Sequence, residues 1–368
     1  MKQACRDLLR ALREPVAMAA FDADAWDLVV RQAASAGLLG RLGALARGAG
    51  VEARLPLAVR RRLQAALTIA EQQQRAVRWE LTQLSQTLAG LEGPVLLLKG
   101  AAYASAGLAP GQGRLFSDID LMVPKAQIDE AEAALMLDGW ATGHRNEYDQ
   151  RYYRQWMHEL PPMTHIRRKT VLDVHHSILP ETARIRTQPA LIIAHAKPLS
   201  EFPRFSVPDP VDLILHSATH LFHEGEWQHG LRDLADLHAL LTQFGGRAGF
   251  WGELLERADD LNLGRPLFYG LRYTARLLRT SIPHDVLMRC PRRPSKPAAV
   301  AMDALFLPAF ATAHASCRHA LSGFAEFALF VRSHWLRMPL RLLVPHLWHK
   351  FQTGRRQGAQ TESTADGA

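Results

Sequence analysis

Three aspartates in two apolar segments are the residues of this sequence best suited to chemistry. Asp118 and Asp120 lie in residues 114–123, RLFSDIDLMV, with one residue between them. Successive side chains of a β-strand alternate between its faces, so the two carboxylates would share one face. Buried carboxylates need a compensating cation, and Mg²⁺, which prefers oxygen ligands and accompanies substrate phosphates, suits such a pair. The spacing therefore predicts a metal-binding strand whose other face carries aliphatic residues: Ile119, Leu121 and Val123.

Asp173 is the third acidic candidate and lies in residues 170–177, TVLDVHHS. On a neighbouring strand it would complete a cluster of three carboxylates. Such a cluster can hold two metal ions about 3.5–4 Å apart for an in-line phosphoryl displacement, and one carboxylate can orient or deprotonate the attacking hydroxyl. Alone, an Asp-x-Asp pair is more typical of a solvated turn, and a single aspartate of a helix cap or an ion pair. The prediction depends on the order of strand, turn and acids.

The apolar pattern around these acids indicates a mixed α/β segment that positions them. An apolar run at 94–98 predicts a buried strand, which ends at the turn Lys99-Gly100. A short helix, the strand with the paired acids and an amphipathic helix are expected to follow, at 101–108, 118–123 and 125–137. Further strand-like pieces lie at 151–157, 163–168 and 170–178.

Helical periodicity dominates both sides of this segment. We expect a helical N-terminal region, an α/β core, a helical C-terminal region and a disordered polar tail, at 1–92, 93–205, 206–352 and 353–368. The tail is too polar to bury a core of its own. The predicted fold class is therefore α+β, with a mixed sheet between helical regions.

The motifs LLKG, GRLFSDIDLMV and VLDVHHSI together resemble the uncharacterised bacterial nucleotidyltransferases, which have the fold of the DNA polymerase β-like enzymes. The resemblance implies a mixed β-sheet flanked by helices, and three acids that bind Mg²⁺ or Mn²⁺ and an NTP such as ATP. By motif position, Asp118 and Asp120 would be the metal-binding pair and Asp173 the third catalytic, metal-binding acid. Gly100 would be the turn glycine whose backbone faces the triphosphate.

Two basic residues near the motif are further candidates for substrate binding. The turn reads Lys99-Gly100-Ala101, without the serine that is common in the wider superfamily, so backbone N–H groups and the helix N-terminus would hold the phosphate. Lys99 either contacts phosphate or lies in solvent at the strand end. Arg114 either neutralises the triphosphate or pairs with a carboxylate of the site.

Residues that follow the third acid complete the list of candidates for substrate binding. Of His175 and His176, one is expected to face the cleft and the other the core. In the resembled family the stretch LRDLAD, residues 231–236, lies beside the cleft, so Arg232, Asp233 and Asp236 are candidates for substrate binding or, more in keeping with their pattern, for an ion-paired helix face. Three histidines share a helix face but are more typical of partly buried bridging residues than of a zinc site: His216, His220 and His223.

The distribution of charge bears on the partners of the protein, and the cysteines bear on disulfide and zinc sites. Residues 291–356 hold ten Lys or Arg and two acidic residues, which equals the whole net charge of +8. Their apolar stretch 324–351 resembles an interfacial membrane helix, or a helix packed on the N-terminal helices with its arginines in water. Cysteines are three and irregularly spaced, so we expect neither a disulfide nor a Cys-based zinc site: Cys5, Cys290 and Cys317.

These features together predict a Mg²⁺-dependent nucleotidyltransferase that moves a nucleotidyl group from an NTP to a hydroxyl of a small molecule, sugar, peptide or protein. The alternative is a catalytically silent binding or scaffold protein of the same fold. We expect a cytoplasmic protein, with peripheral contact at the inner membrane surface through 324–351 as a further expectation. Nucleic acid is not expected as a partner, because the basic excess lies outside the α/β core.

Overall fold

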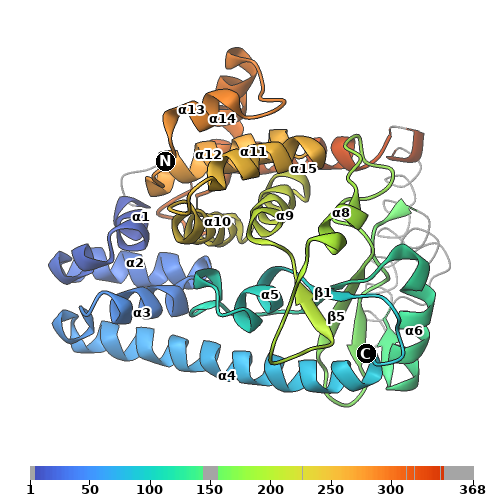
Figure 1. Cartoon of the computed structure of the whole chain (residues 1–368). Coiled ribbons are helices and arrows are strands. Elements are labelled where there is room, and N and C mark those ends of the chain that lie inside the picture. Colours follow the sequence, from blue (N-terminus) through green and yellow to red (C-terminus); the bar gives the residue numbers. More distant parts are fainter. Residues whose placement is uncertain are drawn as a thin grey trace, which may run out of the picture.

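The computed structural model describes residues 5–143, 156–225, 227–311, 313–318, 320–339 and 341–343. Helices on the N-terminal side precede a mixed sheet, and further helices follow it (Figure 1). The elements before the sheet are α1 Arg6–Arg13, α2 Ala23–Ser35, α3 Leu39–Gly48 and α4 Leu57–Thr87. Those after it are α9 Pro210–His223, α10 Gly230–Phe244, α11 Phe250–Asp260, α12 Gly264–Leu278, α13 His284–Arg289, α14 Lys296–Ala309 and α15 Ala320–Arg337.

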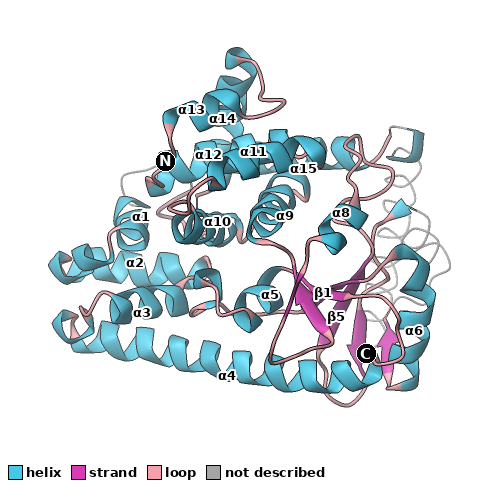
Figure 2. Cartoon of the chain, viewed as in Figure 1, coloured by secondary structure: helices cyan, strands magenta, loops and turns pink. Residues whose placement is uncertain are grey.

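The sheet of the described chain has seven strands in the order β3-β4-β5-β2-β1-β7-β6. The pairs β2–β5 and β1–β7 are parallel, and the other neighbours are antiparallel. The strands are β1 Val95–Leu97, β2 Ile119–Met122, β3 Trp140–Thr142, β4 Met163–His165, β5 Val171–His175, β6 Lys197–Pro198 and β7 Phe205–Val207. Helices α5 Lys99–Ser105, α6 Ile128–Leu137 and α8 Pro189–Ala194 connect them (Figure 2). The predicted α+β class with a mixed sheet flanked by helices is confirmed.

The central strands β1, β2 and β5 lie where the apolar runs predict them, whereas the edge strands β3 and β6, and β7 beside β6, are not predicted. The short helix begins at Lys99, two residues before its predicted start. Most of the strand expected at 151–157 lies outside the described residues, which have a gap at 144–155. The predicted tail at 353–368 and the end of the C-terminal region also lie outside them.

Helix α4 connects the N-terminal helices to the sheet. In Figure 1 it runs along the lower edge of the molecule, from beneath α3 to beneath the strands. At the sheet end its buried Glu80 forms an ion pair with Arg168, at 2.9 Å, and accepts a hydrogen bond from Thr170, at 2.9 Å. Residues 168 and 170 flank the turn that enters β5, so α4 supports the strand that carries the third acid.

The segment that leads into β2 is fixed by a close backbone contact with α3. A Cβ atom on Gly40 of α3 would lie 2.4 Å from the carbonyl oxygen of Gly113, and Gly113 itself has a φ of +69°. Only glycine permits both the approach and the left-handed backbone. The backbone N–H of Phe116 then donates to Gln73 of α4, at 2.9 Å. Together these contacts set the position from which Asp118 and β2 begin.

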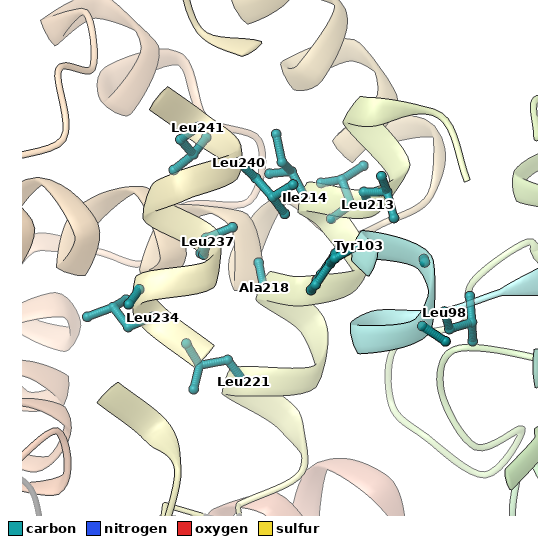
Figure 3. Packing of buried hydrophobic residues seen from close by; sticks show 14 of the residues in the cluster. Leu98, Tyr103, Leu213, Ile214, Ala218, Leu221, Leu234, Leu237, Leu240 and Leu241 are labelled. Atoms are coloured by element: carbon teal, nitrogen blue, oxygen red, sulfur yellow. The ribbon is translucent and has the colours of Figure 1, made fainter. Parts of the chain in front are cut away.

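One continuous apolar core joins the helical regions to the sheet. Figure 3 shows its centre, where Tyr103 lies against α9 near Ile214 and Ala218, and the leucines of α10 lie on the other side of α9. Helix α9 is buried on nearly every side. Its buried residues include polar ones, among them Asp212, His216 and His223, and the helix packs against α5.

A disulfide bond joins Cys5 to Cys317, while Cys290 is free and buried. The expectation of no disulfide is therefore wrong. The bonded positions are 312 residues apart in sequence, so spacing gave no sign of the pairing, which depends on α1 lying against the segment between α14 and α15. Disulfides of this kind are typical of oxidising compartments. Among the described residues, no helix is long and apolar enough to cross a membrane.

Candidate active site

The three aspartates predicted to act together do lie together at the centre of the sheet. Strands β2 and β5 are parallel neighbours with Asp120 directly opposite Asp173. Asp118 comes just before β2, two residues from Asp120, and so shares its face. The alternating residues Ile119 and Leu121 face the other way and are completely buried. Strand register therefore places Asp120 and Asp173 side by side, and the negative charges of Asp120 and Asp118 both act on Asp173.

Asp120 is the buried centre of this group and is held by two cationic partners. Its Oδ1 accepts from Nζ of Lys99 at 2.9 Å and lies 3.2 Å from Nε2 of His175. Burial alone would raise the pKa of the Asp120 carboxyl, but Lys99 and then His175 hold that pKa well below its usual range. Asp120 is therefore a permanent carboxylate, and Oδ1 is the oxygen that its protein partners occupy.

Asp173 is electrostatically unlike Asp120 although the two are neighbours. Burial, and then the charge of Asp120, raise the pKa of Asp173 to about 7. Its Oδ1 is buried and has no hydrogen-bond partner among the residues that the structure describes. A buried oxygen without a donor, next to a second carboxylate, lacks a cation. The donor set at this point is all oxygen, so these residues fit a hard divalent ion such as Mg²⁺.

Asp118 is the most accessible of the three acids. It accepts a hydrogen bond from the hydroxyl of Ser117, at 2.8 Å, and lines a cavity of about 140 Å³ between α4 and the sheet. Phe116 and Lys169 also line this cavity. The acidic cluster therefore extends from the buried Asp120 to a carboxylate that solutes can reach.

The turn between β1 and α5 places Lys99 against Asp120. The backbone N–H of Leu98 donates to the carbonyl of Asp120, at 2.9 Å, and Lys99 then takes a left-handed φ of 44° to begin the helix. Although burial lowers the pKa of the Lys99 ammonium, Asp120 and Glu224 raise it above its usual range. Lys99 is a fixed cation within the site, and the predicted alternative of a strand-end lysine in solvent is not what the structure has.

Gly100 occupies the first turn of α5 with an ordinary helical backbone. A Cβ atom there would lie 2.7 Å from the ring of Phe116 and 3.2 Å from Nε of Arg114. The glycine thus allows the segment before β2 to cross directly over the start of α5.

Arg114 belongs to a buried network of ion pairs. Its guanidinium pairs with Asp236 and lies 3.7 Å from Asp233. Asp236 also accepts from Arg41, at 2.6 Å, and Asp233 accepts from Arg232, at 2.9 Å. Of the two roles predicted for Arg114, the structure has the pairing with carboxylates, but these carboxylates belong to α10 and not to the group of Asp118, Asp120 and Asp173. The structure thus places the candidates Arg232 and Asp233 in this network together with Asp236.

A further acidic residue, Glu224, lies just after the C-terminal end of α9. His220 and Glu224 form an ion pair at 2.5 Å, and Glu224 is close enough to Lys99 to raise the pKa of its ammonium. His216 is buried, and its burial and Lys99 lower the pKa of its imidazole to about 3. Of the three histidines predicted to bridge to the α/β core, His216 lies close to Lys99, whereas His220 pairs with Glu224 and His223 lies near Arg332 and Arg337 of α15.

Sequence reasoning missed Glu159 and left His158 unassigned. Glu159 pairs with His175 in an isolated antiparallel bridge, and its Oε2 lies 3.1 Å from Nδ1 of His175. His175 therefore faces the site, as one of the two consecutive histidines was expected to. No periodic pattern surrounds the His-Glu pair, which precedes two prolines, so nothing in the local sequence signalled it.

Comparison with known proteins adds one finding. A family model described as "Uncharacterised nucleotidyltransferase" matches residues 22–279, a range that includes the three acids, the Lys99 turn and the ion-pair network of α10. No curated protein matches the chain.

Proposed function

The chain belongs to the uncharacterised nucleotidyltransferase family, and from this premise we propose that it catalyses transfer of a nucleotidyl group from an NTP to a hydroxyl acceptor, with Mg²⁺ or Mn²⁺ bound by Asp118, Asp120 and Asp173. The observation that carries the proposal is the facing pair Asp120 and Asp173, in which one carboxyl oxygen is buried without a donor. A protein that only binds or scaffolds gains nothing from this costly arrangement.

The reaction assigns a role to each part of the site. The acceptor oxygen attacks the α-phosphorus, the bond to the β-phosphate breaks, and pyrophosphate leaves. Asp173 orients the acceptor hydroxyl and takes its proton. A bound divalent cation supplies charge neutralisation at the triphosphate. Lys99 holds Asp120 in position from the opposite side and adds positive charge near the phosphates.

Roles for the remaining candidates follow from their contacts. We assign His175 to the positioning of Asp120, since its Nε2 lies 3.2 Å from that carboxylate. Gly100 keeps the backbone of the turn close to the substrate. Arg114 positions the segment before β2 from the α10 side, together with Arg232 and Asp233.

A thermal-shift panel of the four NTPs with Mg²⁺ or EDTA tests the proposal. A ligand that binds only the native state raises Tm by mass action. We expect a Mg²⁺-dependent rise for the wild type that is lost in D118N/D120N. The control is D27N, whose carboxylate lies in an exposed pair with Arg31 on α2; it should keep the full rise. An equal rise in the double variant would place the nucleotide elsewhere, and no rise with any NTP would favour the scaffold alternative.

We also propose that the protein contacts a membrane surface through helix α15. Its inner side is buried, through residues such as Ala325 and Leu329, whereas its outer side exposes a stripe of large apolar side chains: Leu321, Phe324, Phe327, Val331 and Trp335. The packed-helix alternative expected the arginines of this helix to lie in water. Two of them do not, because Arg332 donates to the carbonyl of Phe222 and Arg337 to that of Glu224. The outer stripe is suited to the interfacial region of a bilayer.

Vesicle flotation tests this contact. We expect wild-type protein to float with anionic vesicles, and F324E/F327E to remain in the bottom fraction. V300E is the control, since Val300 is an equally exposed apolar residue of α14 outside the stripe. Flotation of F324E/F327E at the wild-type level would exclude the stripe as the contact.

A further inference from the structure

A group of nitrogen and oxygen donors lies next to the three aspartates but is chemically distinct from them. His158, Glu159 and His175 each offer one ligand atom, and these atoms lie within 4.8 Å of one another; no other such group of three or more His, Cys, Asp or Glu occurs in the described part of the chain. His158 and Glu159 come from the segment before β4, and His175 ends β5. The antiparallel bridge between residues 159 and 175 aligns them.

Hydrogen bonding accounts for His175 but not for His158. The two ring nitrogens of His175 contact Glu159 and Asp120, at 3.1 and 3.2 Å. His158 is 94% buried, yet its Nδ1 has no hydrogen-bond partner among the residues that the structure describes. Its ring lies 5.3 Å from that of His175, centroid to centroid. His158 thus has a buried ring nitrogen without a partner and belongs to a group whose ligand atoms lie within 4.8 Å of one another, which leaves room for a Lewis acid to accept its lone pair.

The electrostatics of the group favour a cation at that point. Burial, and then the neighbouring His175, lower the pKa of His158 well below its usual value, so its imidazole is neutral, the form that binds metals. Although burial opposes them, the carboxylates of Glu159 and Asp120 raise the pKa of His175, so a metal ion bound to this imidazole would take the place of its proton. Lys99 is the opposing cation, but its ammonium is already bound to Asp120.

We propose that His158, Glu159 and His175 form a binding site for a transition-metal ion of the Zn²⁺ class, separate from the all-oxygen site of the three aspartates. Two imidazoles and one carboxylate make up a ligand set that leaves a fourth position open to water or substrate. Imidazole selects Zn²⁺, Ni²⁺ or Cu²⁺ over Mg²⁺. Tetrahedral ligands at about 2.0–2.1 Å from zinc are roughly 3.4 Å apart, so small side-chain rotations suffice.

The hydrogen bond to Asp120 fits this assignment. A histidine that ligates through one nitrogen commonly donates its other N–H to a carboxylate, which fixes the ring and its tautomer. With Nδ1 of His175 on the metal, Nε2–H donates to Oδ1 of Asp120. Asp120 would then support the nitrogen-rich site through Oδ1 while its second oxygen faces the aspartate cluster.

The test is a Zn²⁺ titration of the full-length, chelator-treated protein in millimolar Mg²⁺, followed by competition with a chromophoric chelator. Excess Mg²⁺ occupies the oxygen site, so the titration reports the nitrogen-rich one. We expect one Zn²⁺ per chain in the wild type, and at least tenfold weaker binding in H158Q and in E159Q. H238Q should bind like the wild type, since His238 is a half-buried histidine of α10 that is bonded to Thr280. Co²⁺ in place of Zn²⁺ should give visible bands that are lost in the same two variants.

The variants also separate this site from the proposed nucleotide site. D173N should keep its Zn²⁺ affinity within about threefold of the wild type while losing the Mg²⁺-dependent response to NTP. E159Q changes a partly exposed residue and keeps the test decisive if H158Q fails to fold. Absence of stoichiometric Zn²⁺ in the wild type, or wild-type affinity in folded E159Q, would overturn the proposal. Neither result bears on the nucleotide site, since no nucleotide is present in the titration.

Discussion

At the scale of single residues, the site is built from carboxylates whose negative charges are balanced by different partners. Asp120 has Lys99 and His175, whereas Asp173 has a buried oxygen without a donor. Alternation along strands is enough to predict from sequence that Asp118, Asp120 and Asp173 converge. The same reasoning cannot find Glu159, because it reaches the site from an irregular segment, or Glu224, because it follows the end of a helix.

Asp236 gives a prediction at this scale. Its carboxylate joins two buried arginines, Arg41 and Arg114. D236N would remove the carboxylate that pairs with Arg41 and leave Arg114 with only Asp233, 3.7 Å away. Removal of one partner from a buried ion pair costs about 3–5 kcal/mol. We expect a loss of that order in the free energy of unfolding, measured by urea denaturation. D285N, in an exposed pair with Arg289 on α13, should change it by less than about 0.5 kcal/mol. Similar losses for the two variants would contradict the structural role of the network.

At the scale of elements, long apolar runs are predicted well and short edge strands are not. Strands β1 and β2 are completely buried, so their sequences are continuously apolar apart from Asp120. β6 has two exposed residues, Lys197 and Pro198, and its pairing with β7 depends on tertiary contact and not on pattern. Strand β3 likewise has three residues, one of which is exposed. Such strands carry too few residues for a period-two signal.

The contact of α5 with the segment before β2 gives a prediction at this scale. G100A places a methyl group 2.7 Å from the ring of Phe116, and overpacking of this kind costs about 1–3 kcal/mol. We expect a lower free energy of unfolding, and partial recovery in G100A/F116L, where the ring is smaller. G48A is the matched control, since Gly48 ends α3 with no atom near its added Cβ; it should be neutral or slightly stabilising. Equal stability of G100A and the wild type would show that the segment can move away from α5.

At the scale of the whole molecule, helices from both halves of the chain enclose the sheet. Helix α4 reaches the sheet from the N-terminal side, and from the C-terminal side α9 packs on α5 while α10 packs on α9, within one apolar core (Figure 1). Sequence predicts that these regions are helical. It does not predict which helix supports which strand, because the contacts of Glu80 with Arg168 and Thr170 join positions about ninety residues apart. The disulfide between Cys5 and Cys317 was missed for the same reason.

The disulfide gives the prediction at this scale. Reduction, or C5S/C317S, should lower the free energy of unfolding by about 2–5 kcal/mol, since the unfolded chain regains the freedom that the cross-link removes. Melting curves with and without dithiothreitol measure the effect in the wild type. The double variant should show no response to dithiothreitol, because Cys290 has no partner. Identical wild-type curves under both conditions would mean that the bond adds no stability.

The same bond also changes the topology of the polypeptide. Residues 5–317 form a covalent ring that contains every strand of the described sheet and every residue assigned to either metal site. One backbone cut anywhere inside the ring opens it without releasing a fragment, so a nicked molecule would keep its mass on a non-reducing gel and separate into two pieces only after reduction. New chain ends could therefore be introduced in a surface loop of the ring while all its parts remain one molecule.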